Sequence, residues 1–195
     1  MKHSLTELND VIRNRRSIFP KDFSSRKVHR EQIQVMLENA RWAPTHKMTQ
    51  PWAFEVFMGD ACASFGHDHA EMYKSASGDA FMEKKYEKIR LNAERSSAII
   101  AICMKRDPEE QIPLQEEISA VSMAVQNLHL TATAYGIGGY WGSGGMTYSA
   151  EMKSYLGLTE ADRCLGFFYL GYPDIEWPRK KPRHEVRMFT KWHEE

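Results

Sequence analysis

A run of seven apolar residues, Ala98–Met104 (AIIAICM), constrains the fold of this chain more than any other segment. The run is too short for an independent helix, and its three isoleucines are typical of a strand that is covered on both faces. Farther along, residues 114–135 place apolar side chains at spacings of three and four, and Gly136 follows as a natural C-terminal cap. We therefore expect a central strand and a long core helix.

Weaker patterns predict the remaining elements. Residues 5–13 form an apolar helical stripe with Ser4 or Thr6 as its cap. Apolar residues at helical spacing over 33–40 predict a second helix, which is expected to stop at Pro44. Residues 17–29 are expected to be a loop. The other expected elements are a half-buried strand (52–58), a surface helix that borders a ligand or only solvent (79–95), a short helix (149–156) and a second apolar strand (164–171).

Length and composition bound the class of protein. The 195 residues predict a single domain, 1–195, whose residues 173–195 form a C-terminal arm rich in Pro, Trp and basic side chains. The 26 basic and 26 acidic residues give no net charge, which removes the overall electrostatic case for nucleic acid or an anionic membrane. Three cysteines without a CxxC pair and a polar N-terminus predict a cytoplasmic protein without a membrane span.

Arg15, Arg16 and Ser17 directly follow the first expected helix. Two guanidinium groups can hold a phosphate in a bidentate fashion, and the hydroxyl offers one more hydrogen bond. The alternative is a basic last turn that only offsets the helix dipole.

The loop between the second helix and the first strand contains three hydrogen-bonding side chains, His46, Lys47 and Gln50, between Pro44 and Pro51. The prolines restrict the backbone, and the three side chains could present donors to the edge of a heteroaromatic ring. A solvated loop explains the same residues equally well.

Residues 136–145 hold six of the chain's 12 glycines around Tyr140, Trp141 and Ser143. Such a density indicates a loop or short strand where another group approaches the backbone, or an ordinary tight connection. The spacing fails the GxGxxG pattern and the segment follows a helix, which argues against a Rossmann site.

Other clusters allow a structural as well as a functional interpretation. The basic residues Arg179, Lys180, Lys181 and Arg183 could close on a phosphate or simply keep the arm in solvent. Residues 67–69 (His-Asp-His) fit a polar surface segment better than a metal site, and we expect no bound metal. Cys103 and Cys164 fit small core residues, and no nucleophile motif is present.

In their order and spacing, these motifs resemble the nitroreductase family of FMN-dependent NAD(P)H oxidoreductases. The resemblance covers most of the chain, through residues 15–17, 43–52, 135–144 and 165–171 and the Pro-rich arm after them. It is strongest to a small branch whose loop reads Pro-x-His-Lys-x-x-Gln-Pro-Trp. The ordered set is far more specific than any one of its members.

The resemblance implies an α+β fold, a three-layer sandwich with a mixed, mainly antiparallel sheet flanked by helices. It also implies a homodimer that exchanges its C-terminal arm and binds FMN at the interface. No catalytic side chain is implied, because the flavin carries the chemistry. The implied cofactor-binding residues are Arg15, Arg16, Ser17 and the looser match Arg183 for the phosphate and ribityl chain, His46 and Gln50 from the other subunit, and Trp141, Gly142 and Ser143 packing on the flavin.

The implied activity is a ping-pong transfer of hydride from NADPH or NADH through flavin N5 to an electron-poor small molecule, such as a nitroaromatic, a quinone or an enone. Two other activities fit the same fold: a specialised flavin enzyme such as a dehalogenase or a flavin-cleaving enzyme, and a non-catalytic FMN-binding regulatory or storage module. A purely structural interaction domain is the remaining alternative.

The sequence departs from the family pattern at Phe19. Family members often place a basic residue two positions after the Ser, where a cation stabilises the N1 and C2 carbonyl edge of the reduced flavin. Here Lys47 or His46 could substitute. Four further cations, Lys84, Lys85, Lys88 and Arg90, are available to recognise the 2′-phosphate of NADPH.

Overall fold

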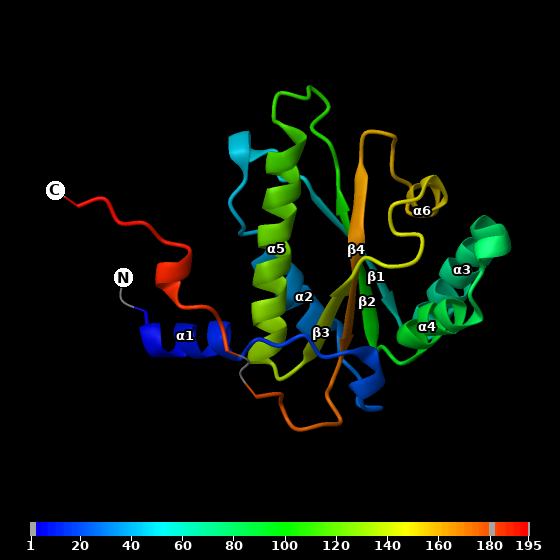
Figure 1. The fold of residues 1–195 in the computed structure, drawn as a ribbon, viewed down its shortest axis with the longest axis horizontal. Coiled ribbons are helices and arrows are strands. Elements are labelled where there is room, and N and C mark those ends of the chain that lie inside the picture. The colour runs from blue at the N-terminus through cyan, green and yellow to red at the C-terminus, as the bar shows by residue number, and fades with distance from the viewer. Residues whose placement is uncertain (1–2, 180–181, 195) are drawn as a thin grey trace.

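A four-stranded antiparallel sheet is the middle layer of the fold (Figure 1). The computed structural model describes residues 3–179 and 182–194. Within these residues the strands lie in the order β1-β2-β4-β3, and parallel pairing is confined to an isolated bridge between Ser17 and Gly139. The sheet of one chain is thus antiparallel, rather than mixed as expected. Its strands are β1 (Trp52–Met58), β2 (Ala98–Met104), β3 (Gly138–Gly142) and β4 (Arg163–Gly171).

The apolar run forms β2, and the prediction of a covered central strand is confirmed. All seven residues of β2 are buried between β1 on one side and β4 on the other. Cys103 and Cys164 pair in register across β2 and β4, and both are buried, as expected of core residues. Since side chains alternate along a strand, β2 contributes to a separate core on each face of the sheet.

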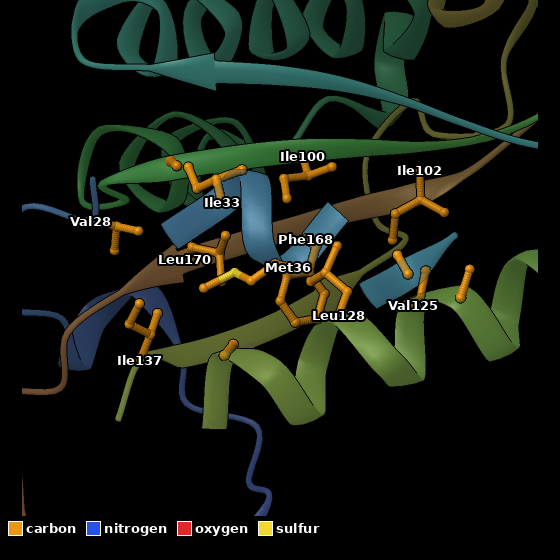
Figure 2. Packing of buried hydrophobic residues seen from close by; sticks show 14 of the residues in the cluster. Val28, Ile33, Met36, Ile100, Ile102, Val125, Leu128, Ile137, Phe168 and Leu170 are labelled. Atoms are coloured by element: carbon orange, nitrogen blue, oxygen red, sulfur yellow. The ribbon is translucent and has the colours of Figure 1, made fainter. Parts of the chain in front are cut away.

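Helices α2 (Arg30–Ala40) and α5 (Leu114–Ala134) cover one face (Figure 1). Ile33 of α2 and Val125 and Leu128 of α5 are buried in one cluster with Ile100 and Phe168 of the sheet (Figure 2). The long helix is therefore a core helix, as its spacing predicts. α2 ends at Ala40, earlier than the predicted stop at Pro44.

Helices α3 (Asp60–Ser77), α4 (Glu83–Glu94) and α6 (Ala150–Tyr155) cover the opposite face. There Phe65 of α3, Ala93 of α4 and Met152 of α6 pack with Ile99 and Phe167 of the sheet. The three-layer α+β sandwich is thus confirmed. α3 is absent from the elements that the sequence predicts.

The C-terminus of α5 leads directly into β3. Gly136 adopts a left-handed conformation (φ 69°), and its N–H donates to Thr133 O at 2.9 Å. The N–H of Ile137 donates to Ala132 O at 2.9 Å, which completes a Schellman motif. The expected cap therefore fixes where the glycine-rich strand begins.

Helix α1 (Leu5–Asn14) forms where its stripe predicts, but it buries none of its residues. Leu5, Leu8 and Ile12 are 67, 52 and 46% exposed. The apolar stripe therefore has no covering partner within the described residues of one chain.

The C-terminal arm leaves the sheet after β4 and passes α1 (Figure 1). The indole N–H of Trp177 donates to Asn14 O at 2.8 Å and ties the arm to the end of α1. Farther along, the side chains of Val186, Met188 and Phe189 are 63–72% exposed. No helix in the described part of the chain is long and apolar enough to cross a membrane.

Candidate functional site

The residues that follow α1 meet the C-terminal arm in a cavity of about 400 Å³. We call it the phosphate cavity; it is lined by Arg15, Arg16, Ser17, Ile18, Phe19, Asp22, Ile175, Pro178, Arg179 and Arg183. Arg15 and Arg183 are far apart in sequence, and the structure brings them together as the resemblance implies. Lys180 and Lys181 of the same basic cluster lie outside the described residues.

The phosphate cavity is strongly positive. Burial lowers the pKa of Arg15, and the nearby charges of Arg16 and Arg183 lower it further. Asp22 is the one carboxylate among the described lining residues, and it lies 3.5 Å from the ammonium of Lys21. Clustered guanidinium groups in a hollow suit a phosphate, because its charge relieves their repulsion and its oxygens accept bidentate hydrogen bonds.

The guanidinium of Arg16 is mostly used within the chain. Its Nη1 donates to Arg13 O at 2.9 Å and to Arg15 O at 2.6 Å, and its Nε donates to Arg179 O at 3.3 Å. Arg16 thus joins the end of α1 to the arm. Its Nη2 makes no hydrogen bond within the described residues and can still donate to a ligand.

His129 of α5 contacts the backbone of Arg16, and its role is not predicted from the sequence. The ring is buried in α5, and its Nε2 lies 3.0 Å from Arg16 O. Burial, aided by the charge of Arg15, lowers the pKa of His129 to about 4. A neutral ring therefore donates its Nε2–H to the carbonyl. A polar residue on the apolar face of a predicted core helix is the signal that could have found it.

The glycine-rich strand β3 lies directly beside residues 17 and 18. Ile18 N–H donates to Gly139 O at 3.1 Å, next to the bridge between Ser17 and Gly139. A Cβ on Gly139 would lie 2.5 Å from Cζ of Phe168, so this close approach requires glycine. Two motifs that the sequence places far apart thus form one continuous surface.

Two more cavities continue this surface along α4. The ring cavity, of about 480 Å³, is lined by Phe19, Lys21, Lys84, Glu87, Lys88, Leu91, Asn92, Arg95 and Tyr140. The inner cavity, of about 240 Å³, is lined by His69, Lys85, Lys88, Ile89, Asn92, Tyr140, Gly142, Gly144, Gly145 and Tyr169.

The three cavities share lining residues and together form what we call the trench. Phe19 lines both the phosphate cavity and the ring cavity. Tyr140, Lys88 and Asn92 line both the ring cavity and the inner cavity. The trench therefore leads from an end lined by arginines to a slot with aromatic and glycine walls. The predicted surface helix borders the trench. The sequence suggests Lys88 only as one of four cations available for the 2′-phosphate of NADPH, and it does not identify Asn92.

Trp141 and Gly142 end β3 and Ser143 follows it, and of the three only Gly142 lines the inner cavity. The indole N–H of Trp141 donates to Leu165 O at 3.0 Å, where β4 has a bulge. The indole is thus already anchored, and Trp141 can offer a ligand its ring or its backbone. Gly142 is buried and Ser143 exposed, and their contact with a flavin remains a prediction.

His69 contradicts the interpretation of residues 67–69 as a surface segment. Its ring is 2% exposed, on α3, and its Nε2 accepts a hydrogen bond from Met146 N–H at 2.9 Å. Burial lowers its pKa to about 4, with the charge of Lys85 as a smaller cause. The neutral ring then carries its proton on Nδ1, which is buried and has no partner in the described structure. His69 thus lines the inner cavity as a neutral ring whose Nε2 holds the backbone at Met146.

His46 and Gln50 lie at the other end of α5. Nδ1 of His46 is 2.6 Å from a carboxylate oxygen of Glu116, in the first turn of that helix, whereas Arg16 contacts His129 near its last turn. The rise along the helix between these two contacts is about 20 Å. One chain therefore does not bring His46 and Gln50 to the trench.

The loop that carries His46 and Gln50 has an unusual backbone. Lys47, Met48 and Gln50 have φ values of 47, 58 and 48°, in the left-handed region that costs energy for residues with a side chain. The hydroxyl of Thr45 accepts a hydrogen bond from Gln50 N–H at 3.1 Å and holds the loop in shape. Such strain persists where the surroundings fix it, and it is common in binding segments.

The trench fits a phosphorylated planar cofactor. The described residues contain no group of three or more His, Cys, Asp or Glu side chains arranged to hold a metal ion. The donors are instead guanidinium, ammonium, amide and imidazole N–H groups, which match phosphate oxygens and ring carbonyls. Aromatic and glycine walls suit a flat ring.

Comparison with known proteins finds relatives along most of the chain. The model of the nitroreductase family matches residues 12–172. YfhC of Bacillus subtilis (strain 168), named a putative NAD(P)H nitroreductase, is 32% identical over 186 residues, which cover 95% of this chain and 93% of YfhC. YdjA of Escherichia coli (strain K12), described in the same words, is 32% identical over 146 residues, covering 75% and 78%.

Solved structures share the fold. The nitroreductase-like family protein from Bacillus cereus superposes with a TM-score of 0.81 at 27% identity, over 100% of both chains. The FMN and NADPH-dependent nitroreductase NfnB from Sphigopyxis sp. strain HMH has a TM-score of 0.75 at 16% identity, over 95% and 98%. Since the family model spans most of the chain and YfhC is related along nearly its full length, this protein belongs to the nitroreductase family.

Proposed function

We propose that this protein is an NAD(P)H-dependent FMN oxidoreductase that reduces electron-poor small molecules, such as nitroaromatics, quinones or enones. The observation that carries the proposal is the trench, which joins a cluster of arginines to the ring cavity and to the inner cavity beside Gly142. The names of YfhC and YdjA support the hydride donor, and the name of NfnB supports the cofactor.

Each part of the trench has a separate task in this proposal. Arg15 and Arg183 bind the FMN phosphate, while Arg16 and His129 hold the backbone that presents Ser17. Tyr140 and the glycines after it form the wall against the ring. FMN, when bound, would accept hydride from NAD(P)H and pass it to the acceptor in a second half-reaction. This chemistry requires no nucleophilic side chain.

We also propose a homodimer in which each site uses two chains. Along α5 the contacts of His46 and of Arg16 are separated by a rise of about 20 Å, and neither His46 nor Gln50 lines the trench of its own chain. A second copy placed across α5 supplies them. The exposed stripe of α1 and the exposed apolar side chains of the arm support this arrangement, because they need a partner to leave water. Exchange of residues 173–195 between the two copies would cover both.

The test is the visible absorption spectrum of the purified protein after incubation with FMN and desalting. We expect retained yellow flavin that bleaches on anaerobic addition of NADPH or NADH, and steady oxidation of that nucleotide when a nitroaromatic or a quinone is added. Light scattering of the yellow protein is expected to give the mass of a dimer.

Each failure of this test has its own meaning. A colourless protein contradicts the FMN assignment. Retained flavin that neither nucleotide bleaches favours a non-catalytic FMN-binding module. Bleaching without turnover of any of the three acceptor classes favours a specialised flavin enzyme, and a flavin-loaded monomer refutes the shared site.

A further inference from the structure

The loop after β3, residues 143–147, places two glycines in the wall of the inner cavity. Gly144 and Gly145 line that cavity, and their backbone N–H groups make no hydrogen bond within the described residues. Both groups are therefore free to donate to a ligand that carries carbonyl oxygens or ring nitrogens. A loop with two glycines is flexible by itself, so its shape depends on the side chains around it.

Two side chains fix this loop. Thr147, within the loop, donates its hydroxyl to Gly144 O at 2.7 Å. His69 holds the loop from another element, α3, where its Nε2 accepts the N–H of Met146 at 2.9 Å. A Cβ on Gly145 would collide with the ring of His69, so the loop lies directly against the imidazole.

The imidazole of His69 is itself held in place. Its ring centroid lies 5.6 Å from that of Phe65 in the previous turn of α3 and 5.2 Å from that of Phe167 in β4. Burial lowers the pKa of His69 to about 4, so the ring stays neutral at pH 7 and Nε2 keeps the lone pair that accepts from Met146. The sheet and α3 thus set the position of the loop through one packed side chain.

Stability alone does not explain a histidine at this position. Its Nδ1–H is buried and has no partner within the described residues, and an unpaired buried donor costs free energy. An apolar side chain among the same aromatic rings would avoid that cost, but it would leave the N–H of Met146 without an acceptor. The histidine therefore favours the geometry of the loop over the stability of the core.

We infer that His69 is a positioning residue for the cofactor: it holds the loop so that the N–H groups of Gly144 and Gly145 meet acceptor atoms of the flavin ring. The inference rests on the proposed function. His69 acts through the loop and does not touch the reacting atoms. It adds α3, which the sequence patterns do not predict, to the elements that shape the site.

The experiment compares His69→Gln with His69→Asn. The amide of glutamine reaches about as far as Nε2 of histidine and can accept from Met146, whereas the amide of asparagine is one methylene shorter and falls short of it. His69→Leu removes the acceptor altogether, so the test does not depend on one substitution.

Ser97→Ala is the matched control. The hydroxyl of Ser97 accepts the N–H of Val28 at 2.7 Å, at a buried position outside the residues that line the trench. Each variant is titrated by fluorescence with FMN and with riboflavin, which has the same ring but no phosphate. The visible circular dichroism of bound FMN reports the surroundings of the ring, and thermal melting checks the fold.

We expect His69→Asn and His69→Leu to weaken binding of FMN and of riboflavin by the same factor, about tenfold, because a hydrogen bond to the ring is lost while the phosphate contacts stay. The visible circular dichroism should change as well. His69→Gln is expected to keep most of the wild-type affinity and spectrum. Ser97→Ala should lower the melting temperature and leave both dissociation constants unchanged.

Three results would overturn the inference. These are an unchanged FMN affinity and circular dichroism in His69→Asn and His69→Leu, an equal loss of affinity in Ser97→Ala, and a loss for FMN that riboflavin does not share, since the last places the effect at the phosphate. A wild-type protein that binds no FMN is a distinct outcome, which refutes the proposed function itself and the inference with it.

Discussion

Acidification is expected to destabilise this protein through two buried histidines, His69 and His129. Burial lowers the pKa of each to about 4, so both are neutral in the folded protein at pH 7. In the unfolded chain a histidine has a pKa of about 6.5. Between pH 6.5 and pH 4 the unfolded state therefore binds more protons than the folded state. The contribution of these histidines to the free energy of unfolding is therefore complete above about pH 6.5, and it is lost as the pH falls from 6.5 to 4.

The size of the effect follows from the width of the window. One histidine contributes a slope of about 1.4 kcal/mol per pH unit, and the window spans roughly 2.5 units. Each histidine then costs about 3 kcal/mol by pH 4, and the two together about 6 kcal/mol. Since the total stability of a domain is commonly about 5–15 kcal/mol, the fold is expected to be marginal at pH 4.

Urea unfolding at a fixed protein concentration, repeated between pH 7 and pH 4.5, measures this slope. The informative variant is His129→Gln, which keeps an N–H donor for the carbonyl of Arg16 but does not titrate. Its free energy of unfolding should fall less steeply with decreasing pH, by about 1.4 kcal/mol per unit. His184→Gln, in the exposed arm, serves as the control and should run parallel to the wild type.

Comparison of slopes removes any uniform loss of stability that the substitution causes. If His129→Gln and the wild type run parallel through the whole window, the buried ring is not neutral.

Three further outcomes are expected. Arg15→Ala should weaken FMN binding about 10- to 100-fold, because one or more charge-assisted hydrogen bonds of about 1.5–3 kcal/mol are lost; an unchanged dissociation constant in a fluorescence titration would exclude Arg15 as a ligand. Gly139→Ala should lower the melting temperature, with a loss of about 1–3 kcal/mol from the clash with Phe168, and an unaltered melting curve would contradict the close packing. Glu117→Gln should lower the urea midpoint of unfolding, because Arg106 loses the charge of its buried partner; an unchanged midpoint would refute this.

The sheet and the long helix were predictable because their patterns are dominated by burial. A strand such as β2, covered on both faces, must be apolar throughout, and the buried face of α5 repeats at helical spacing. α3 gave no such signal. Its buried face includes Gly66 and His69 beside Cys62 and Phe65, so small and polar types interrupt the apolar stripe. Gly66 is needed because Ala93 of α4 occupies the space of a side chain there.

The candidate site was predictable in its motifs but not in its assembly. Residues 15–17 and the glycine-rich segment are recognisable from their own residue types. Without an alignment of homologues, the sequence does not indicate which distant residues lie beside them. The approach of Arg183 to Arg15 depends on the path of the arm past α1. Lys88 and Asn92 belong to a charged helix in which most side chains only face solvent, so nothing local distinguished them.

The length of α5 has a genetic consequence. Because Arg15 and His46 lie at opposite ends of this helix, each proposed active site is built from residues of two polypeptides. A chain damaged at Arg15 and a chain damaged at His46 would each be inactive alone, yet their heterodimer would contain one site with both lesions and one with neither. Random reassortment of equal amounts would then restore about one site in four. Two null alleles of this gene could thus complement each other in one cell.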